Sequence, residues 1–152
     1  MRSAYKYLAY GIVGLIFVQA AAIAWAIFGE GKYIEDGHTV SKATQDADSL
    51  PFPEVVGFIV HGINGEMLIP LVAVILLVVS FLAKIPEGPK WAGMLLGGIV
   101  VQILLGLFGG SLPFLGLLHG LNALLLVILA LRTGRQGDVV VGATTAEAAA
   151  VR

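Results

Sequence analysis

Long apolar stretches dominate the chain, and the polar residues gather between them. Four stretches reach the roughly 20 mostly apolar residues that a helix needs to cross the hydrocarbon core of a bilayer. These stretches cover residues 8–28, 55–83, 91–108 and 113–131. No water is present at that depth to satisfy bare backbone groups, so each span is expected to be a helix. The pattern therefore predicts an all-α fold, a transmembrane four-helix bundle.

Proline and small residues refine these limits. Pro70 lies inside the second span and has no N–H to donate to the carbonyl of Glu66, four residues back, so we expect a kink there. Beyond residue 135 the chain is rich in small residues and shows no apolar period. We therefore assign residues 1–135 to the bundle and 136–152 to a flexible tail.

The distribution of basic residues predicts an orientation, because Lys and Arg favour the cytoplasmic side. They precede the first span, separate the second from the third, and follow the fourth: Arg2, Lys6, Lys84, Lys90, Arg132 and Arg135. The segment 30–53 carries five acids against two lysines. Both termini are accordingly expected in the cytoplasm, and this acidic segment is expected to form an outer loop.

Composition supports a membrane protein and excludes several functions. Hydrophobic residues make up 58% of the chain and charged residues 12%, well below the roughly 25% of soluble domains. Lipid is therefore the expected surrounding. A net charge of −1 gives no basic field to attract nucleic acid. The absence of cysteine excludes disulfides, thiol catalysis, cysteine-ligated clusters and covalent c-type haem.

One short motif occurs twice. The residues Ser-Leu-Pro-Phe lead into the second span at 49–52 and into the fourth at 111–114. Inside these spans follow His-Gly-Ile-Asn at 61–64 and His-Gly-Leu-Asn at 119–122. The echo predicts two tandem helical hairpins whose second helices run in the same direction. Both histidines would then lie at one depth, roughly 10 Å below the outer boundary.

Two histidines at one depth are what a haem b requires, because its iron takes one axial nitrogen on each face. We expect His61 and His119 to be these ligands. Gly62 and Gly120, which follow them, would leave room for the flat macrocycle. The function predicted from this site is electron transfer, with a quinone or a redox partner protein, alone, as an oligomer or as a subunit of a larger complex.

The neighbouring polar residues leave other interpretations open. Asn64 and Asn122 lie on the same helix faces as the histidines and would hold the haem propionates or orient an imidazole. Alternatively, Asn and His pair helices in membranes at about 0.6 kcal/mol each without any cofactor. The chain would then be a non-catalytic accessory or assembly subunit. Gln19 and Gln102 lie mid-span, where a helix–helix hydrogen bond is favoured over a quinone contact.

Glu66 is the acid inside a span, and it allows a third interpretation. Together with the two histidines it would form a proton pathway or a small transporter. A protonated carboxyl bonded to a neighbouring helix is favoured, because the second hairpin has an apolar residue at the matching place. His38, in the acidic loop, is expected to be solvated, since the loop offers too few ligands for zinc. No motif indicates catalysis.

In layout and in its paired His-Gly-x-Asn motif, the chain resembles one four-helix half of haem A synthase. More loosely it resembles four-helix cytochrome b membrane proteins and bacterial families of small four-helix membrane proteins. The resemblance implies a bacterial inner membrane location, and it implies axial ligation by His61 and His119. Haem A synthase has further histidines and acids in its helices, so the resemblance here extends to one haem and not to that enzyme's oxidation.

Overall fold

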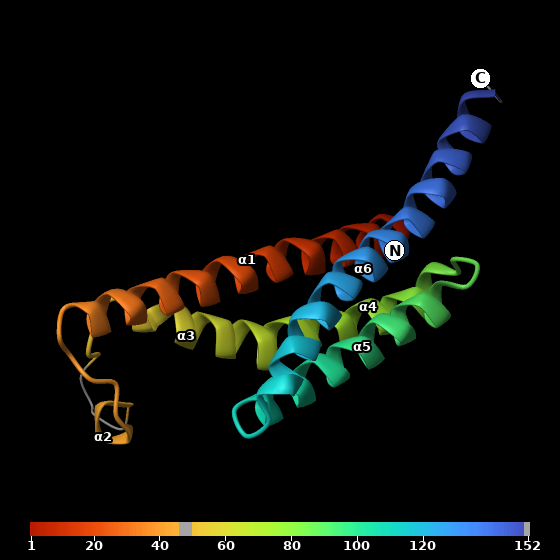
Figure 1. Ribbon diagram of the computed structural model, residues 1–152. Helices are drawn as coiled ribbons and strands as arrows, with labels where there is room; N and C mark the ends of the chain where they lie inside the picture. Colours follow the sequence, from red (N-terminus) through yellow and green to blue (C-terminus); the bar gives the residue numbers. More distant parts are fainter. Residues whose placement is uncertain (46–49, 151–152) are drawn as a thin grey trace.

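The computed structural model describes residues 1–45 and 50–150, and of residues 43, 45 and 138–150 the backbone alone. Asp46 and Asp48 of the acidic segment, and residues 151–152 of the predicted tail, lie outside the described residues. All regular structure in the described part is helical (Figure 1). The elements are α1 (Arg2–Glu35), α2 (Lys42–Gln45), α3 (Val55–Ile63), η1 (Asn64–Leu68), α4 (Ile69–Ala83), α5 (Gly88–Gly109) and α6 (Pro113–Ala150).

The four predicted spans are confirmed. Four helical units in the described part are long and apolar enough to cross a membrane: α1, the continuous α3–η1–α4, α5 and α6. Their outer surfaces carry large exposed apolar side chains, among them Phe28, Phe81 and Phe114 at 80%, 64% and 65% exposure. In water such surfaces would cause association. The fold is that of a multi-pass membrane protein.

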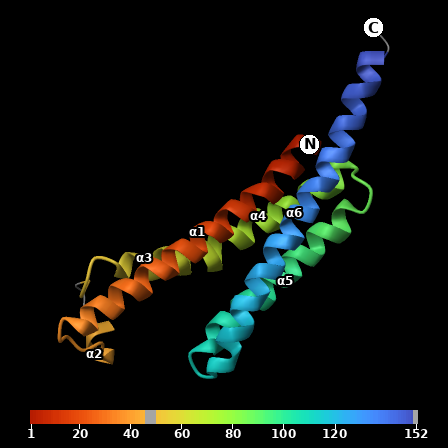
Figure 2. The ribbon, with the colours of Figure 1, turned by 45° about the horizontal axis from the view of Figure 1, so that its top comes forward.

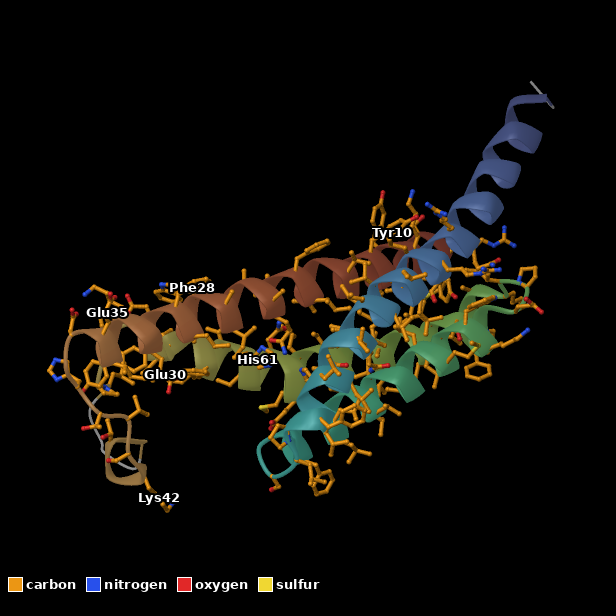
Figure 3. The ribbon with its side chains drawn as sticks, viewed as in Figure 1. Tyr10, Phe28, Glu30, Glu35, Lys42 and His61 are labelled. Carbon is orange, nitrogen blue, oxygen red and sulfur yellow. The ribbon has the colours of Figure 1, made fainter. Side chains whose placement is uncertain are left out.

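The first and last helices extend well beyond their predicted spans. The first helix begins at Arg2 and ends at Glu35, so Glu30 and Glu35 lie on α1 and not in the loop (Figure 3). The last helix continues beyond residue 131 to Ala150. Hydropathy reports the part of a helix that lies in lipid, and a helix that satisfies its own backbone continues into water. The alanines near the chain end favour that continuation. Flexibility of the tail concerns motion and stays a prediction.

A π-helical turn precedes Pro70, where the sequence predicts a kink. The N–H of Ile69 donates to the carbonyl of Asn64, five residues back, so the turn η1 is wider than an α-helical one. It lies immediately before the proline, whose ring crowds the preceding turn. Single π-turns of this kind adjust the direction of long helices and are frequent at functional sites. Here the turn begins three residues after His61.

The helices form two pairs that pack closely at one end. α1 packs on α3, α5 packs on α6, and the pairs are joined through α1 with α6 and α4 with α5. Figure 2 shows the pairs separating toward the start of α3 and the α5–α6 turn. We call this the loop end, and the opposite end, which holds the start of α1 and the α4–α5 turn, the terminal end.

The hydrophobic core joins the pairs at the terminal end. Its largest fully buried apolar side chains are Tyr5, Ile12, Leu76, Leu95 and Ile99. The whole cluster comprises Tyr5, Ala9, Ile12, Val13, Ile16, Ile69, Ala73, Leu76, Ala83, Ile85, Ala92, Leu95, Ile99, Leu126 and Ala130. Every member lies on the terminal side of the His61 and His119 positions along its helix. The space at the histidine level is therefore not filled by this core.

Within the first pair, small residues allow α1 and α3 to approach closely. A Cβ added to Gly57 would overlap the backbone carbonyl oxygen of Ala22 and lie 2.9 Å from the Cβ of Ala26. Both alanines are buried. Small residues at such positions are what lets membrane helices pack backbone to backbone. The contact fixes the position of α3, and with it that of His61.

Candidate functional site

The polar residues of the first pair bind α3 and η1 to α1. The Nδ1 atom of His61 lies 3.2 Å from the backbone oxygen of Gln19. The side-chain amide of Asn64 donates to the backbone oxygen of Leu15 at 3.0 Å and to Oε1 of Gln19 at 3.1 Å. A carbonyl oxygen can accept but not donate, so the ring Nδ1 carries the proton. In the neutral imidazole, Nε2 is then left with its lone pair.

The second pair repeats this arrangement bond for bond. The Nδ1 atom of His119 lies 3.0 Å from the backbone oxygen of Gln102. The amide of Asn122 donates to the backbone oxygen of Gly98 at 3.0 Å and to Oε1 of Gln102 at 2.8 Å. The matched bonds are those expected of two like hairpins. An origin by duplication stays a prediction.

The two imidazole rings meet across the gap between the pairs. The centroids of His61 and His119 lie 6.2 Å apart, with 50° between the ring planes. Metal–imidazole bonds of about 2.0–2.1 Å, added to roughly 1.1 Å from ring centroid to nitrogen, place two opposed ligands of one metal roughly 6 Å apart, centroid to centroid. The ring separation is therefore the one that two axial ligands need.

Two adjoining hollows flank the ring pair. Their volumes are about 850 Å³ and 320 Å³, and both are lined by His61, His119, Gln19 and Gln102. These volumes fall within the range of small-molecule and cofactor sites. Otherwise the lining is mainly aliphatic side chains and glycine, with Phe58 at the larger hollow. Such walls accept an apolar ligand.

The two glycines that follow the histidines face open space. Gly62 lines the larger hollow and Gly120 the smaller. A Cβ added at either would meet no atom within 4 Å outside its own helix backbone and chain neighbours. The room expected beside each ligand is present. That a macrocycle occupies it stays a prediction.

Another glycine, Gly106 on α5, contacts the second histidine directly. A Cβ added there would lie 3.0 Å from Cε1 and 3.1 Å from Nδ1 of His119. An added Cβ at Gly93 or Gly97, on the same helix, would meet open space instead. Gly106 is thus the α5 glycine against which the His119 ring rests.

The asparagines and glutamines join the helices within each pair, and the role of the asparagines toward haem propionates stays a prediction. The bonds of Asn64 and Asn122 run to backbone oxygens and to the two glutamines, and not to an imidazole. The expected helix–helix role of Gln19 and Gln102 is confirmed by the same bonds. Asn64 is 5% exposed, and its Oδ1 atom has no hydrogen-bond partner among the described residues.

Glu66 lines the larger hollow and is exposed. No hydrogen bond or ion pair joins its carboxyl to another residue that the structure describes, so the expected bond to a neighbouring helix is not found there.

His38 is exposed and stacks on Tyr33, with ring centroids 4.4 Å apart. Among the described residues, no group of three or more His, Cys, Asp or Glu is placed to hold a metal ion.

No protein family, curated protein or solved structure matches the chain. The likeness to haem A synthase therefore rests on the layout of the helices and the paired motif alone.

Proposed function

We propose that this chain is a membrane-bound b-type haem protein in which His61 and His119 ligate one haem from opposite faces. The observation that carries the proposal is the 6.2 Å separation of two rings that approach from different helix pairs. Helix pairing accounts for the Nδ1 bonds, because each of these stays inside its own pair. It does not account for two rings meeting between the pairs.

The residues around the rings fit this ligand. Each ring donates from Nδ1 to a backbone carbonyl, the usual support for a metal-bound histidine, which fixes the tautomer and the ring direction. The Nε2 atom of each ring then remains for the iron. In both rings the acceptor is the carbonyl of a glutamine that is itself held by an asparagine. The support is thus built identically on both sides.

Haem held in this way supplies one-electron oxidation and reduction, and its potential depends on its ligands and burial. The chain's own contribution is to hold the two rings and to keep water from them with aliphatic walls. Among the residues that line the two hollows there is no lysine or arginine. Haem propionates would therefore need a counter-charge or water from outside the two hollows.

The proposed role is electron transfer with a quinone or a redox partner protein, in a bacterial inner membrane with both termini cytoplasmic. Support for the orientation comes from the basic residues at the terminal end, which the positive-inside rule assigns to the cytoplasm. The exposed apolar flanks leave surface for lipid, a second copy or other subunits.

Purification from haem-sufficient cells tests the proposal. The detergent-solubilised full chain is expected to carry about one haem per chain and to show the sharp reduced-minus-oxidised difference spectrum of a low-spin b-type haem with two histidine ligands. A colourless preparation that also takes up no added haemin would contradict it. The accessory-subunit interpretation, in which the polar residues only pair helices, would then stand.

A substitution at Gly106 tests whether His119 is positioned as described. Gly106→Ala pushes a methyl group against the His119 ring, so we expect weaker haem retention and a shifted spectrum. Gly97→Ala is the matched control on α5, because its added methyl meets open space. Both changes gain helix propensity alike. Equal haem retention in the two variants would show that the ring does not rest on Gly106.

A proton pathway is the second candidate, favoured by Glu66 at the larger hollow, which is exposed and has no hydrogen bond or ion pair with another described residue. An ionisable group inside a span is costly unless it serves a function. If the chain conducts protons, liposomes containing it will dissipate a pH gradient, and Glu66→Gln will slow this by at least tenfold, a loss of about 1.4 kcal/mol. Equal rates with and without the protein would dismiss this function.

A further inference from the structure

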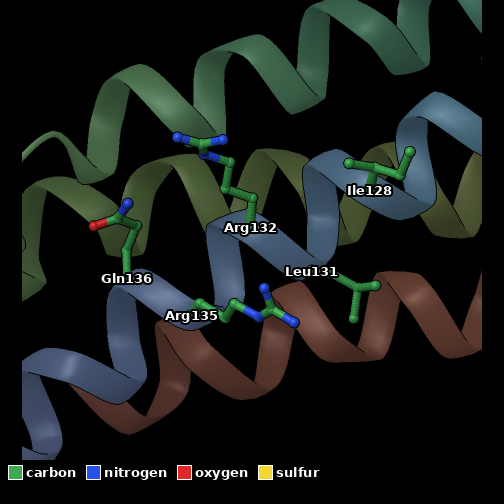
Figure 4. A pocket seen from close by; sticks show the side chains of 5 residues that line it. All are labelled: Ile128, Leu131, Arg132, Arg135 and Gln136. Atoms are coloured by element: carbon green, nitrogen blue, oxygen red, sulfur yellow. The ribbon is translucent and has the colours of Figure 1, made fainter.

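A groove with two arginines runs along α6 at the terminal end, away from the histidines. Ile128, Leu131, Arg132, Arg135 and Gln136 line it, and its volume is about 500 Å³. In Figure 4 these side chains project from α6 between the α5 and α1 ribbons, with Arg132 on the α5 side and Arg135 on the α1 side. Their spacing of three, four, seven and eight residues keeps them on one face of the helix.

The groove is apolar toward the bilayer and polar toward the terminal end. Ile128 is 62% exposed and belongs to the lipid-facing surface. Arg135 lies seven residues further along α6, a rise of about 10 Å. A phospholipid changes from an apolar acyl chain to a charged headgroup over a similar distance. The groove therefore matches an amphiphile that is already part of the membrane better than it matches a dissolved anion.

The two guanidinium groups have no acidic partner among the described side chains. Arg132 lies over the Trp91 ring, 4.7 Å from its centroid, so one face of the guanidinium is covered and its N–H edge stays available. The nearby acid Glu87 is bonded to Lys90 at 3.3 Å. Two arginines that have no ion pair with any described side chain, placed beside one groove, call for an anion with several acceptor oxygens.

We propose that this groove binds the headgroup of an anionic phospholipid in the leaflet at the terminal end. The phosphate lies at Arg132 and Arg135, Gln136 donates its side-chain amide to headgroup oxygens, and an acyl chain follows Leu131 and Ile128. Arginine favours such phosphate oxygens because its planar fork forms two parallel hydrogen bonds. Attraction of basic residues to anionic lipid adds to this. The proposal does not depend on haem.

Native mass spectrometry of the full chain in detergent tests the groove. The probes are phosphatidylglycerol and phosphatidylcholine with identical acyl chains. The unaltered protein is expected to retain phosphatidylglycerol preferentially. Arg135→Gln, which removes no hydrogen bond or ion pair within the described chain, and Arg132→Gln should each reduce that preference about fivefold. The control is the double variant Arg2→Gln/Lys84→Gln, which removes two positive charges at the same end without touching a groove residue.

The outcomes separate the sources of binding. A preference lost in the arginine variants and kept in the control supports the proposal. If the control loses as much as the arginine variants, the effect is general charge attraction and the site is refuted. Equal retention of both lipids by the unaltered protein also refutes it. Displacement of the lipid by millimolar inorganic phosphate would identify a site for a small dissolved anion and overturn the lipid assignment.

Discussion

Replacing either His61 or His119 by alanine is expected to remove essentially all bound haem. One axial bond cannot compensate for the other, because the ligands come from separate helix pairs that the core does not join at this level. Haem per purified chain should fall from about one to near zero, measured by absorbance of a pyridine extract. His38→Ala is the matched control, since His38 is exposed and stacked on Tyr33, away from the site.

Folding of the histidine variants can be checked separately. Each variant loses one interhelical hydrogen bond, worth about 0.6 kcal/mol in membrane proteins, which leaves the fold intact. The variants should therefore elute like the unaltered protein on size exclusion. Free imidazole added to His119→Ala with haemin is expected to restore the low-spin spectrum by filling the vacated ring position. Full haem retention in either variant would refute axial ligation by that residue.

Gly57→Ala is expected to destabilise the first helix pair strongly. The added Cβ would overlap the backbone oxygen of Ala22, so α1 and α3 must separate. Overpacking of this kind costs about 1–3 kcal/mol, more than the roughly 1 kcal/mol that alanine gains over glycine in a helix. The melting temperature in a fixed detergent should drop by several degrees.

The control for this change is Gly14→Ala on α1, the other helix of the pair. Its added methyl meets no atom within 4 Å, so its melting temperature should be unchanged or slightly higher. If both variants melt alike, the close approach of α1 and α3 at Gly57 is not a packing contact. Loss of haem from Gly57→Ala is a second expected effect, because α3 carries His61.

Hydropathy predicts much of the fold. It predicts the ends of a helix only where prolines or charged residues bound the helix itself. The second span is predicted at both limits, Val55 and Ala83, because prolines and charged residues bound it. The end of α1 is missed, since Glu30 and Glu35 mark where the chain leaves lipid and not where the helix stops. The π-turn is missed as well. Pro70 predicts an irregular helix at this point, but it does not predict that the preceding residues form a π-helical turn.

The candidate site, like the fold, is predicted from the sequence only in part. The paired motif makes His61 and His119 candidates and predicts a common depth, and the structure brings their rings together. Backbone carbonyls carry no sequence signal, so the acceptors of the Nδ1 protons could not be named in advance. The contact between Gly106 and His119 could not be predicted for another reason. Four residues after Gln19, the first hairpin has Ile23 where the second has Gly106, so the repeat gives no hint of this contact.

The confinement of the core to the terminal end predicts an order of assembly for the proposed haem protein. Since Tyr5, Leu76, Leu95 and their neighbours fasten the four helices on one side of the histidines, the chain can insert and close that half without any ligand. At the opposite end the helix pairs separate, and the histidine rings already lie 6.2 Å apart there. If the chain binds haem as proposed, the haem can therefore enter between the pairs after the helices have packed.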